Sequence, residues 1–289
     1  MPPYLAFFLD GRSFITGNLL MVVGLGLFMV EGNRRWPALT GRVLCLIGIV
    51  LVGVSAIPVW PWLYALWGML AVAGLAVPLL PRRFEQLRTS VLLAAMIGIA
   101  CFLVFELPSW QAPKLSLPAD LQIHVIGDSL SAGIGKEKPW PARLSIPGNH
   151  PVTNAAIAGA TTATAMRQAE ALPTEPSLVL LEIGGNDLLY GTSADDFGRD
   201  LDALLTRLKK DNRIVIIFEL PLPPGSNGYG LQQRRLADKH GCLLIPRYYL
   251  ARILCFPGNT CDGLHLSNQG HQMLADSVAR IFDDKRGNP

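Results

Sequence analysis

The chain has 289 residues, of which 50% are hydrophobic and only 16% are charged, with a formal net charge of +3. Soluble globular proteins normally carry about 25% charged residues, so this composition argues against a protein that is soluble along its whole length. The deficit is uneven, because residues 1–118 hold only twelve charged side chains. The sequence contains no basic patch interleaved with aromatic residues, so we expect no nucleic-acid partner.

Four apolar stretches in the first 106 residues are long enough to cross a bilayer, which takes about 20 mostly apolar residues. The first runs from Ser13 to Val30 and the last from Thr89 to Phe105. Between them, Val43 to Pro81 has no charge and suits two helices, with a break at Ile57–Trp62 where prolines end a helix and tryptophans suit an interface. A signal peptide is a poorer interpretation, because three apolar stretches follow the first and no small-residue cleavage site is evident. Helices buried in a large soluble protein are the other alternative, but nothing else in the chain would cover them.

Arginines between the apolar stretches predict their orientation in the membrane. Two loops contain them: Arg34, Arg35 and Arg42 lie in one, and Arg82, Arg83 and Arg88 in the other. By the positive-inside rule both loops are cytoplasmic. Both termini and the C-terminal domain are then expected on the periplasmic side of a bacterial inner membrane. The spans contain no Asp, Glu, Lys, Arg or His, so they indicate an anchor and not an ion path. Glycines in the spans, Gly24 with Gly26 or Gly48 with Gly53, are either close helix-packing points or merely tolerated.

The C-terminal half alternates apolar runs with helical patterns, which predicts a parallel sheet covered by helices on both faces. The expected strands are Leu121–Ile126, Pro151–Ala155, Ser177–Ile183, Arg213–Leu220 and Cys242–Ile245. The expected helices are Trp140–Leu144, Thr162–Ala171, Ala194–Lys210, Gly230–His240 and Asn268–Phe282. We therefore expect a membrane region over residues 1–106, a linker over residues 107–118 and an α/β domain over residues 119–285.

Four short motifs follow strands or precede the last helix of the predicted domain. They are Gly127-Asp128-Ser129-Leu130, Asn154 to Gly159, Gly184-Gly185-Asn186-Asp187 and Asp262-Gly263-Leu264-His265. In open α/β sheets the active site lies at the carboxyl ends of the strands, which is where these motifs fall. A serine hydroxyl needs an adjacent base to act as a nucleophile. His265 is the expected base for Ser129, and Asp262, three residues earlier, is suited to hold the imidazole in the right tautomer.

These four motifs, in this order, resemble the conserved blocks of the SGNH (GDSL) hydrolase family, and the resemblance covers residues 119–285. It implies a flavodoxin-like three-layer αβα domain with a parallel five-stranded sheet, preceded here by an all-α transmembrane region. It also implies ester hydrolysis with a catalytic triad of Ser129, Asp262 and His265. The oxyanion donors that it implies are the backbone N–H groups of Ser129 and Gly159 and the side-chain amide of Asn186. We expect no metal and no cofactor.

Other residues carry weaker indications. Asp128 and Asp187 are expected to support turns, and the remaining histidines, His124, His150, His240 and His271, are expected to be structural. In an oxidising compartment Cys255 and Cys261 are expected to form a small disulfide beside Asp262, with two free thiols as the alternative.

The sequence does not identify one substrate. The resemblance implies an acyl ester, and an extracytoplasmic location favours membrane lipids, small esters or O-acyl groups on envelope glycans over acyl-CoA. An apolar acyl groove is one interpretation of Leu188, Leu189 and Tyr190 with the segment Leu220–Pro223, and packing is the other. An O-acyltransferase, in which a sugar hydroxyl replaces water, would use the same triad.

Overall fold

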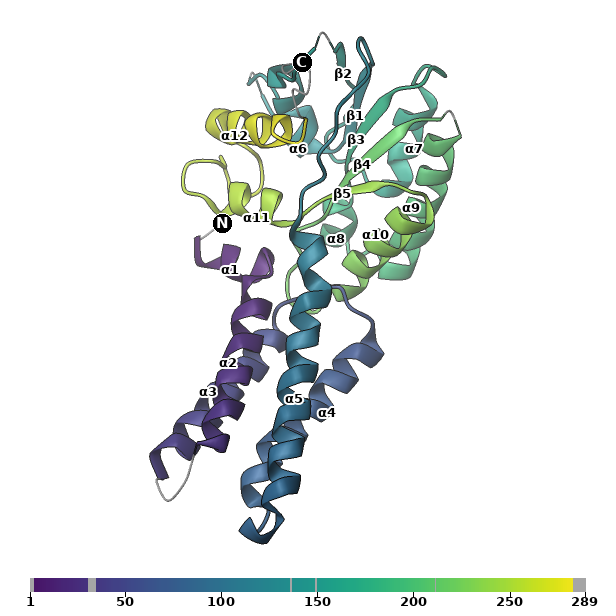
Figure 1. Cartoon of the computed structure of the whole chain (residues 1–289). Coiled ribbons are helices and arrows are strands. Elements are labelled where there is room, and N and C mark those ends of the chain that lie inside the picture. Colours follow the sequence, from purple (N-terminus) through teal and green to yellow (C-terminus); the bar gives the residue numbers. More distant parts are fainter. Residues whose placement is uncertain (1–2, 31–34, 136, 149, 211, 283–289) are drawn as a thin grey trace, which may run out of the picture. The chain divides into compact units, whose positions relative to one another are not determined.

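The computed structural model describes residues 3–30, 35–135, 137–148, 150–210 and 212–282 (Figure 1). The chain divides into two compact units. One contains Gln111–Leu222 and Gly228–Pro289 together with Met1–Ala6, and the other contains Phe7–Trp110 and Pro223–Asn227. Arg34 and residues 283–285, which the sequence assigned to a cytoplasmic loop and to the α/β domain, lie outside the described residues.

The N-terminal unit is helical. Its main helices are α2 (Arg12–Met29), α3 (Arg35–Gly53), α4 (Pro61–Ala76) and α5 (Glu85–Glu106), after a short α1 (Ala6–Leu9). Within the described residues, four helices are long and apolar enough to cross a membrane. They correspond to the four apolar stretches of the sequence, and the interruption between α3 and α4 falls at the predicted proline- and tryptophan-containing segment.

Small residues bring α2 and α3 into close antiparallel contact. A Cβ atom added at Gly17 would lie 2.7 Å from the Gly48 carbonyl oxygen, and one added at Gly24 would lie 2.7 Å from the Gly41 carbonyl oxygen. Gly24 and Gly48 are therefore helix-packing points, as one interpretation of the sequence held. The other two glycines of that prediction are not closely packed: Gly26 and Gly53.

One buried polar contact joins α2 to α4. The Trp67 indole N–H donates to Asn18 Oδ1 at 2.8 Å, and the Asn18 amide donates to the Phe14 carbonyl at 2.8 Å. Asn18 is fully buried, so these bonds satisfy an amide that apolar surroundings would otherwise penalise.

The second unit is built on a parallel five-stranded sheet in the order β2-β1-β3-β4-β5. The strands are β1 (Ile123–Gly127), β2 (Val152–Asn154), β3 (Leu178–Glu182), β4 (Ile214–Phe218) and β5 (Leu243–Ile245). All five lie within the strands that the sequence predicts, except for the last residue of β1. The sheet and its flanking helices confirm the predicted α/β fold.

Helices cover both faces of this sheet (Figure 1). They are α6 (Ser129–Ala132), α7 (Thr162–Glu170), α8 (Gly185–Leu189), α9 (Ala194–Lys209), α10 (Asn227–Lys239), α11 (Tyr248–Cys255) and α12 (Asn268–Ala279). The helices α7, α9 and α10 lie on one face, and α11 and α12 lie on the other. The segment Trp140–Arg143, predicted as a helix, is a 3-10 helix.

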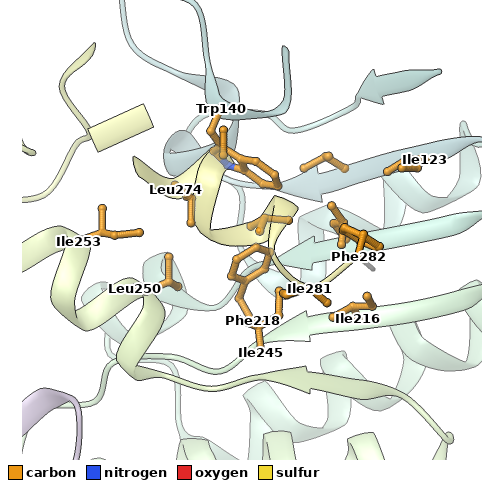
Figure 2. Packing of buried hydrophobic residues seen from close by; sticks show 14 of the residues in the cluster. Ile123, Trp140, Ile216, Phe218, Ile245, Leu250, Ile253, Leu274, Ile281 and Phe282 are labelled. Atoms are coloured by element: carbon orange, nitrogen blue, oxygen red, sulfur yellow. The ribbon is translucent and has the colours of Figure 1, made fainter. Parts of the chain in front are cut away.

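An apolar core lies between the sheet and the helices α11 and α12 (Figure 2). Ile123, Ile216 and Phe218 from the strands pack there against side chains of both helices. The buried Trp140 ring packs edge-on against Phe218, with 5.7 Å between the ring centroids. Strand side chains alternate between the two faces, and Val179, Leu181 and Ile217 are buried on the opposite face. Burial on both faces explains why these strands are apolar along nearly their whole length.

Part of the predicted linker belongs to this unit. The Leu115 N–H donates to the Ile281 carbonyl at 2.9 Å, and Leu115 forms a parallel bridge with Phe282. Lys114 Nζ donates to the Arg280 carbonyl at 2.8 Å. The chain is therefore fixed to the α/β unit from about Lys114 onward.

Candidate active site

The four motifs meet at the carboxyl edge of the sheet. Strands β1, β2 and β3 are neighbours, and they end at Gly127, Asn154 and Glu182. Because parallel strands end at the same edge, the segments that carry Ser129, Gly159 and Asn186 all leave the sheet there. The motif with Asp262 and His265 lies in the loop before α12.

Ser129 is the first residue of α6, directly after β1. The preceding Asp128 caps this helix, and its Oδ1 accepts from the Leu130 N–H at 3.0 Å. The turn is tight: a Cβ atom at Gly127 would lie 2.7 Å from the Glu182 carbonyl oxygen and 2.8 Å from Ser131 Oγ. Glycine is therefore needed at the junction between β1 and the serine turn.

Three N–H donors were predicted to face a developing oxyanion. Over the described ranges, the backbone N–H groups of Ser129 and Gly159 donate to no protein acceptor. Gly159 has φ of +78°, in the left-handed region that favours glycine. The Asn186 amide nitrogen is already engaged, at 2.9 Å from the Ala160 carbonyl and 3.3 Å from Asp128 Oδ2. This side chain is thus held at the serine turn, with the longer of its two bonds going to Asp128.

His265 and Asp262 form a hydrogen-bonded pair. His265 Nδ1 lies 2.6 Å from Asp262 Oδ2, while Asp262 Oδ1 accepts from the His265 and Leu264 N–H groups at 2.8 and 2.9 Å. The His265 backbone N–H, the His265 imidazole and the Leu264 N–H together lower the pKa of Asp262, so this carboxyl stays ionised at neutral pH. Within the described chain, no hydrogen bond joins Ser129 to His265, which is common before substrate binds. An electrostatic interaction links His265 to Asp128, the residue before Ser129.

The two other acidic residues of the motifs support turns, as predicted. Asp128 caps α6, and Asp187 Oδ2 accepts from the Thr162 N–H at 2.8 Å and the Thr162 hydroxyl at 3.1 Å. Asp187 thereby joins α8 to the first turn of α7.

A buried polar network below the serine turn was missed at the level of sequence. Ser131 Oγ donates to Glu182 Oε2 at 2.9 Å and accepts from the Trp140 indole N–H at 3.1 Å. The Asn154 amide donates to the Ser131 carbonyl at 2.8 Å. The signal that would have revealed it is Glu182 itself, an acidic residue in an otherwise apolar predicted strand.

The remaining histidines have structural surroundings. His124 is buried in β1, His150 Nδ1 contacts the Leu121 carbonyl at 3.0 Å, and His240 Nε2 lies 2.6 Å from Asp202. His271 is buried in α12, where burial lowers its pKa to about 4.

The structure corrects one prediction and favours one of two interpretations of another. No disulfide joins Cys255 to Cys261: Cys255 is buried in α11, while Cys261 is exposed and its thiol donates to the Leu266 carbonyl at 3.7 Å. Leu220 and Leu222 are buried, which favours packing as the role of these two residues, whereas Leu189 and Tyr190 are exposed. In the described part of the chain, no cluster of three or more His, Cys, Asp or Glu side chains is suited to hold a metal ion.

The parallel five-stranded sheet, with helices on both faces and the serine turn at its carboxyl edge, is the architecture of the SGNH class of α/β enzymes. Comparison with known proteins identifies the family. Residues 125–273 match the GDSL-like lipase/acylhydrolase family. The chain belongs to this family and is a carboxylic ester hydrolase.

Individual relatives agree with this assignment. The chain is 34% identical to esterase TesA of Pseudomonas aeruginosa over 173 residues, which are 53% of this chain and 84% of TesA. It is 29% identical over 180 residues to an arylesterase of Vibrio mimicus, covering 56% of this chain and 88% of the relative. Among solved structures, a psychrotrophic esterase EstA from Pseudoalteromonas is 25% identical with a TM-score of 0.49, covering 55% of this chain and 94% of EstA.

Proposed function

We propose that the chain is a membrane-anchored serine ester hydrolase in which Ser129 is the nucleophile, His265 the general base and Asp262 the residue that orients His265. The observation that carries this proposal is the 2.6 Å contact between His265 Nδ1 and Asp262 Oδ2. It fixes the proton on Nδ1 and leaves Nε2 as the basic nitrogen. The proximity of His265 to Asp128 supports its pairing with the neighbouring serine.

The reaction begins with attack of Ser129 Oγ on the ester carbonyl carbon. The hydroxyl proton passes to His265 Nε2, and the carbonyl oxygen becomes an oxyanion. The N–H groups of Ser129 and Gly159 are unused donors for this charge. Asn186 supplies a third when its longer bond, to Asp128, gives way to the oxyanion. Such preorganised donors lower the barrier because they need little reorganisation during the reaction.

The second half of the reaction releases the acyl group. Collapse of the tetrahedral intermediate breaks the bond to the alcohol, which leaves with the proton from His265. Water then attacks the acyl-serine, giving its proton to the same nitrogen, and the acid is released. Two alternatives act on an envelope glycan. In an O-acyltransferase, a sugar hydroxyl would replace water as the acceptor of the acyl group. In an O-acetyl esterase, an acetyl ester of the glycan would be the substrate. The chain's own residues would perform the same steps without a cofactor.

Exposed apolar side chains in the motif loops favour a lipophilic acyl ester as substrate. Ile134 follows the Ser129 motif, Ile157 lies in the Gly159 motif, and Leu189 and Tyr190 follow Asn186. Leu189 and Tyr190 are 60% and 69% exposed. Exposed apolar groups gathered around a site typically mark a surface for an apolar ligand.

The four apolar helices support a location at the bacterial inner membrane, with membrane lipid as their surroundings. We propose a membrane region over residues 1–106, a connection over residues 107–118 and a hydrolase domain over residues 119–285. The arginines of the two loops support a cytoplasmic position for these loops and a periplasmic position for both termini and the hydrolase domain.

Hydrolysis of p-nitrophenyl esters of increasing chain length by the full-length protein in detergent tests this proposal. We expect hydrolysis that is lost in Ser129→Ala, and a preference for medium or long chains. A preference for acetyl ester together with transfer to an added glycan acceptor would favour the alternative. An unchanged rate in folded Ser129→Ala would exclude Ser129 as the nucleophile.

A further inference from the structure

Glu182 interrupts an apolar row in the core of the hydrolase unit. It ends β3 on the same face as Leu178 and Leu180, both members of the apolar core, and it is 1% exposed. Over the described residues, no Lys, Arg or His forms an ion pair with it. Burial of a carboxyl without a cation is costly unless the group is hydrogen bonded, so the contacts of Glu182 must explain its presence.

Over the described residues, the polar contacts of Glu182 go to the turn that contains Ser129. Its Oε2 accepts from Ser131 Oγ at 2.9 Å, and Ser131 Oγ is held from its other side by the Trp140 indole. The carboxyl of Glu182 also interacts electrostatically with the carboxyl of Asp128. The residue immediately before Ser129 and the residue two positions after it are thus both coupled to one buried acid.

Burial raises the pKa of Glu182 well above its ordinary value, which favours its neutral form. A neutral carboxylic acid has one O–H to donate, and the carboxyl of Asp128 is the neighbouring acceptor with which it interacts. Asp128 in turn accepts from the Leu130 N–H and from the Asn186 amide. Asp128 therefore connects the surroundings of Glu182 with the Asn186 amide.

We propose that Glu182 is a positioning residue that holds the serine turn through Ser131 and sets the surroundings of Asp128, which accepts from the Asn186 amide. This inference rests on the proposed roles of Ser129 and Asn186. A positioning role differs from a purely stabilising one, because substitution of Glu182 should change catalysis even in protein that remains folded.

The pKa of Asp128 can be followed through the pH dependence of kcat/KM, which a change in stability alone would not shift. The titratable groups that face Asp128 are Glu182 from β3, Asp187 from α8 and His265 from the loop before α12. Burial raises the pKa of Asp128 to about 6, and the neighbouring Glu182 side chain lowers it. Loss of that polar side chain should therefore raise the pKa of Asp128 further and move the acidic limb of kcat/KM to higher pH.

The test compares Glu182→Gln with Glu182→Met in the full-length protein in detergent. Gln keeps an N–H donor and a carbonyl acceptor, whereas Met keeps the length of the side chain without either. We expect Glu182→Gln to stay within about tenfold of the wild-type kcat with an unshifted acidic limb. Glu182→Met should lose about 10²-fold in kcat with little change in KM, and its acidic limb should shift to higher pH. The matched control is Leu180→Ala, which weakens the core of the same strand without touching the turn and should keep kcat per folded molecule.

Two measurements keep this proposal separate from the proposed hydrolysis. Circular dichroism reports the folded fraction, and the rate of labelling of Ser129 by a fluorophosphonate reports its reactivity without any ester. Wild-type protein that is labelled but hydrolyses no ester would contradict the hydrolase function, and the Glu182 variants would then be judged by their labelling rates. Equal rates in folded wild type and Glu182→Met, or equal losses in Glu182→Met and Glu182→Gln, would overturn the role of Glu182.

Discussion

At the scale of single residues, the described part of the chain contains two His–Asp contacts of the same length, and one of them lies beside the serine turn. His265 Nδ1 contacts Asp262 and His240 Nε2 contacts Asp202, both at 2.6 Å. Their difference lies in the surroundings. Asp202 also accepts from Lys239 on the surface, whereas Asp262 is bound by backbone N–H groups of the motif itself. Geometry of the pair alone therefore does not identify a catalytic histidine.

We predict that Asp262→Asn lowers kcat by about 10³- to 10⁴-fold with little change in KM. The Asn amide would donate to Nδ1, which moves the imidazole proton to Nε2 and removes the base that Ser129 needs. Steady-state hydrolysis of a p-nitrophenyl ester by the full-length variant measures this. Asp202→Asn is the matched control and should leave kcat unchanged. Activity within tenfold of wild type in Asp262→Asn would argue against the proposed role of Asp262.

The buried acid also predicts how stability depends on pH. Glu182 keeps a proton in the folded protein that the unfolded chain releases near its ordinary pKa of 4.5. Because the folded state then binds more protons, stability falls as the pH rises, by up to about 1.4 kcal/mol per pH unit. The fall continues until the pH reaches the raised pKa. Glu182→Gln should remove this contribution.

Chemical denaturation between pH 6.5 and 8.5 measures this effect. Above its pKa of about 6, Asp128 is ionised and no longer changes the slope of stability against pH. Glu219 provides the control, since it is equally buried but Arg234 and Arg247 outweigh the effect of burial and lower its pKa. Glu219→Gln should leave the slope of stability against pH unchanged. The same slope in wild type and Glu182→Gln would show that Glu182 is ionised in the folded protein.

At the scale of elements, the sequence identified the strands and the long helices because their periodicity and apolar length are distinctive. In the α/β unit it missed three short helices, α6, α8 and α11. The first two have four and five residues, too few to show a helical period. The third, α11, contains Tyr248 and Tyr249 and lies between Pro246 and Pro257, and aromatic residues and prolines are weak indicators of a helix.

In the site, likewise, the sequence revealed the residues of local motifs and missed those whose roles depend on contacts between distant segments. Ser129, Asn186 and the Asp262–His265 pair were recognisable because each lies in a short motif of fixed spacing. The roles of Ser131, Trp140 and Asn154 depend on contacts between distant segments, which no local pattern contains. The absence of a disulfide between Cys255 and Cys261 also depends on the direction that each side chain takes.

Packing of α2 against α3 leads to a prediction at this scale. A Cβ atom at Gly48 would lie 2.6 Å from the Gly17 carbonyl oxygen, whereas one at Gly68, within α4, meets nothing within 4 Å. Gly48→Ala should therefore destabilise the helical unit by about 1–3 kcal/mol through overpacking. Gly68→Ala should be neutral or stabilising by up to about 1 kcal/mol. Reversible unfolding in mixed detergent, followed by circular dichroism, compares the two, and equal effects would contradict close packing at Gly48.

At the scale of the whole molecule, the proposed topology places the hydrolase domain and the arginine loops on opposite sides of the membrane. Cys261 is an exposed free thiol in the loop that precedes His265, and Arg83 is an exposed residue between α4 and α5. A membrane-impermeant maleimide applied to intact spheroplasts should therefore label Cys261. In a Cys261→Ser background, it should label Arg83→Cys only after the membrane is disrupted.

The Cys261→Ser protein alone measures labelling of the other four cysteines and is the control for both experiments. If Arg83→Cys is labelled in intact spheroplasts and Cys261 only after lysis, the hydrolase domain is cytoplasmic, and acyl-CoA becomes available as a substrate. Labelling of Cys261 without prior reduction would agree with the free thiol of the structure, whereas a need for reductant would indicate that this thiol is oxidised in the cell. Because glycan esters of the envelope lie outside the cytoplasm and acyl-CoA lies inside it, the side on which Cys261 reacts decides which of these substrates is worth testing.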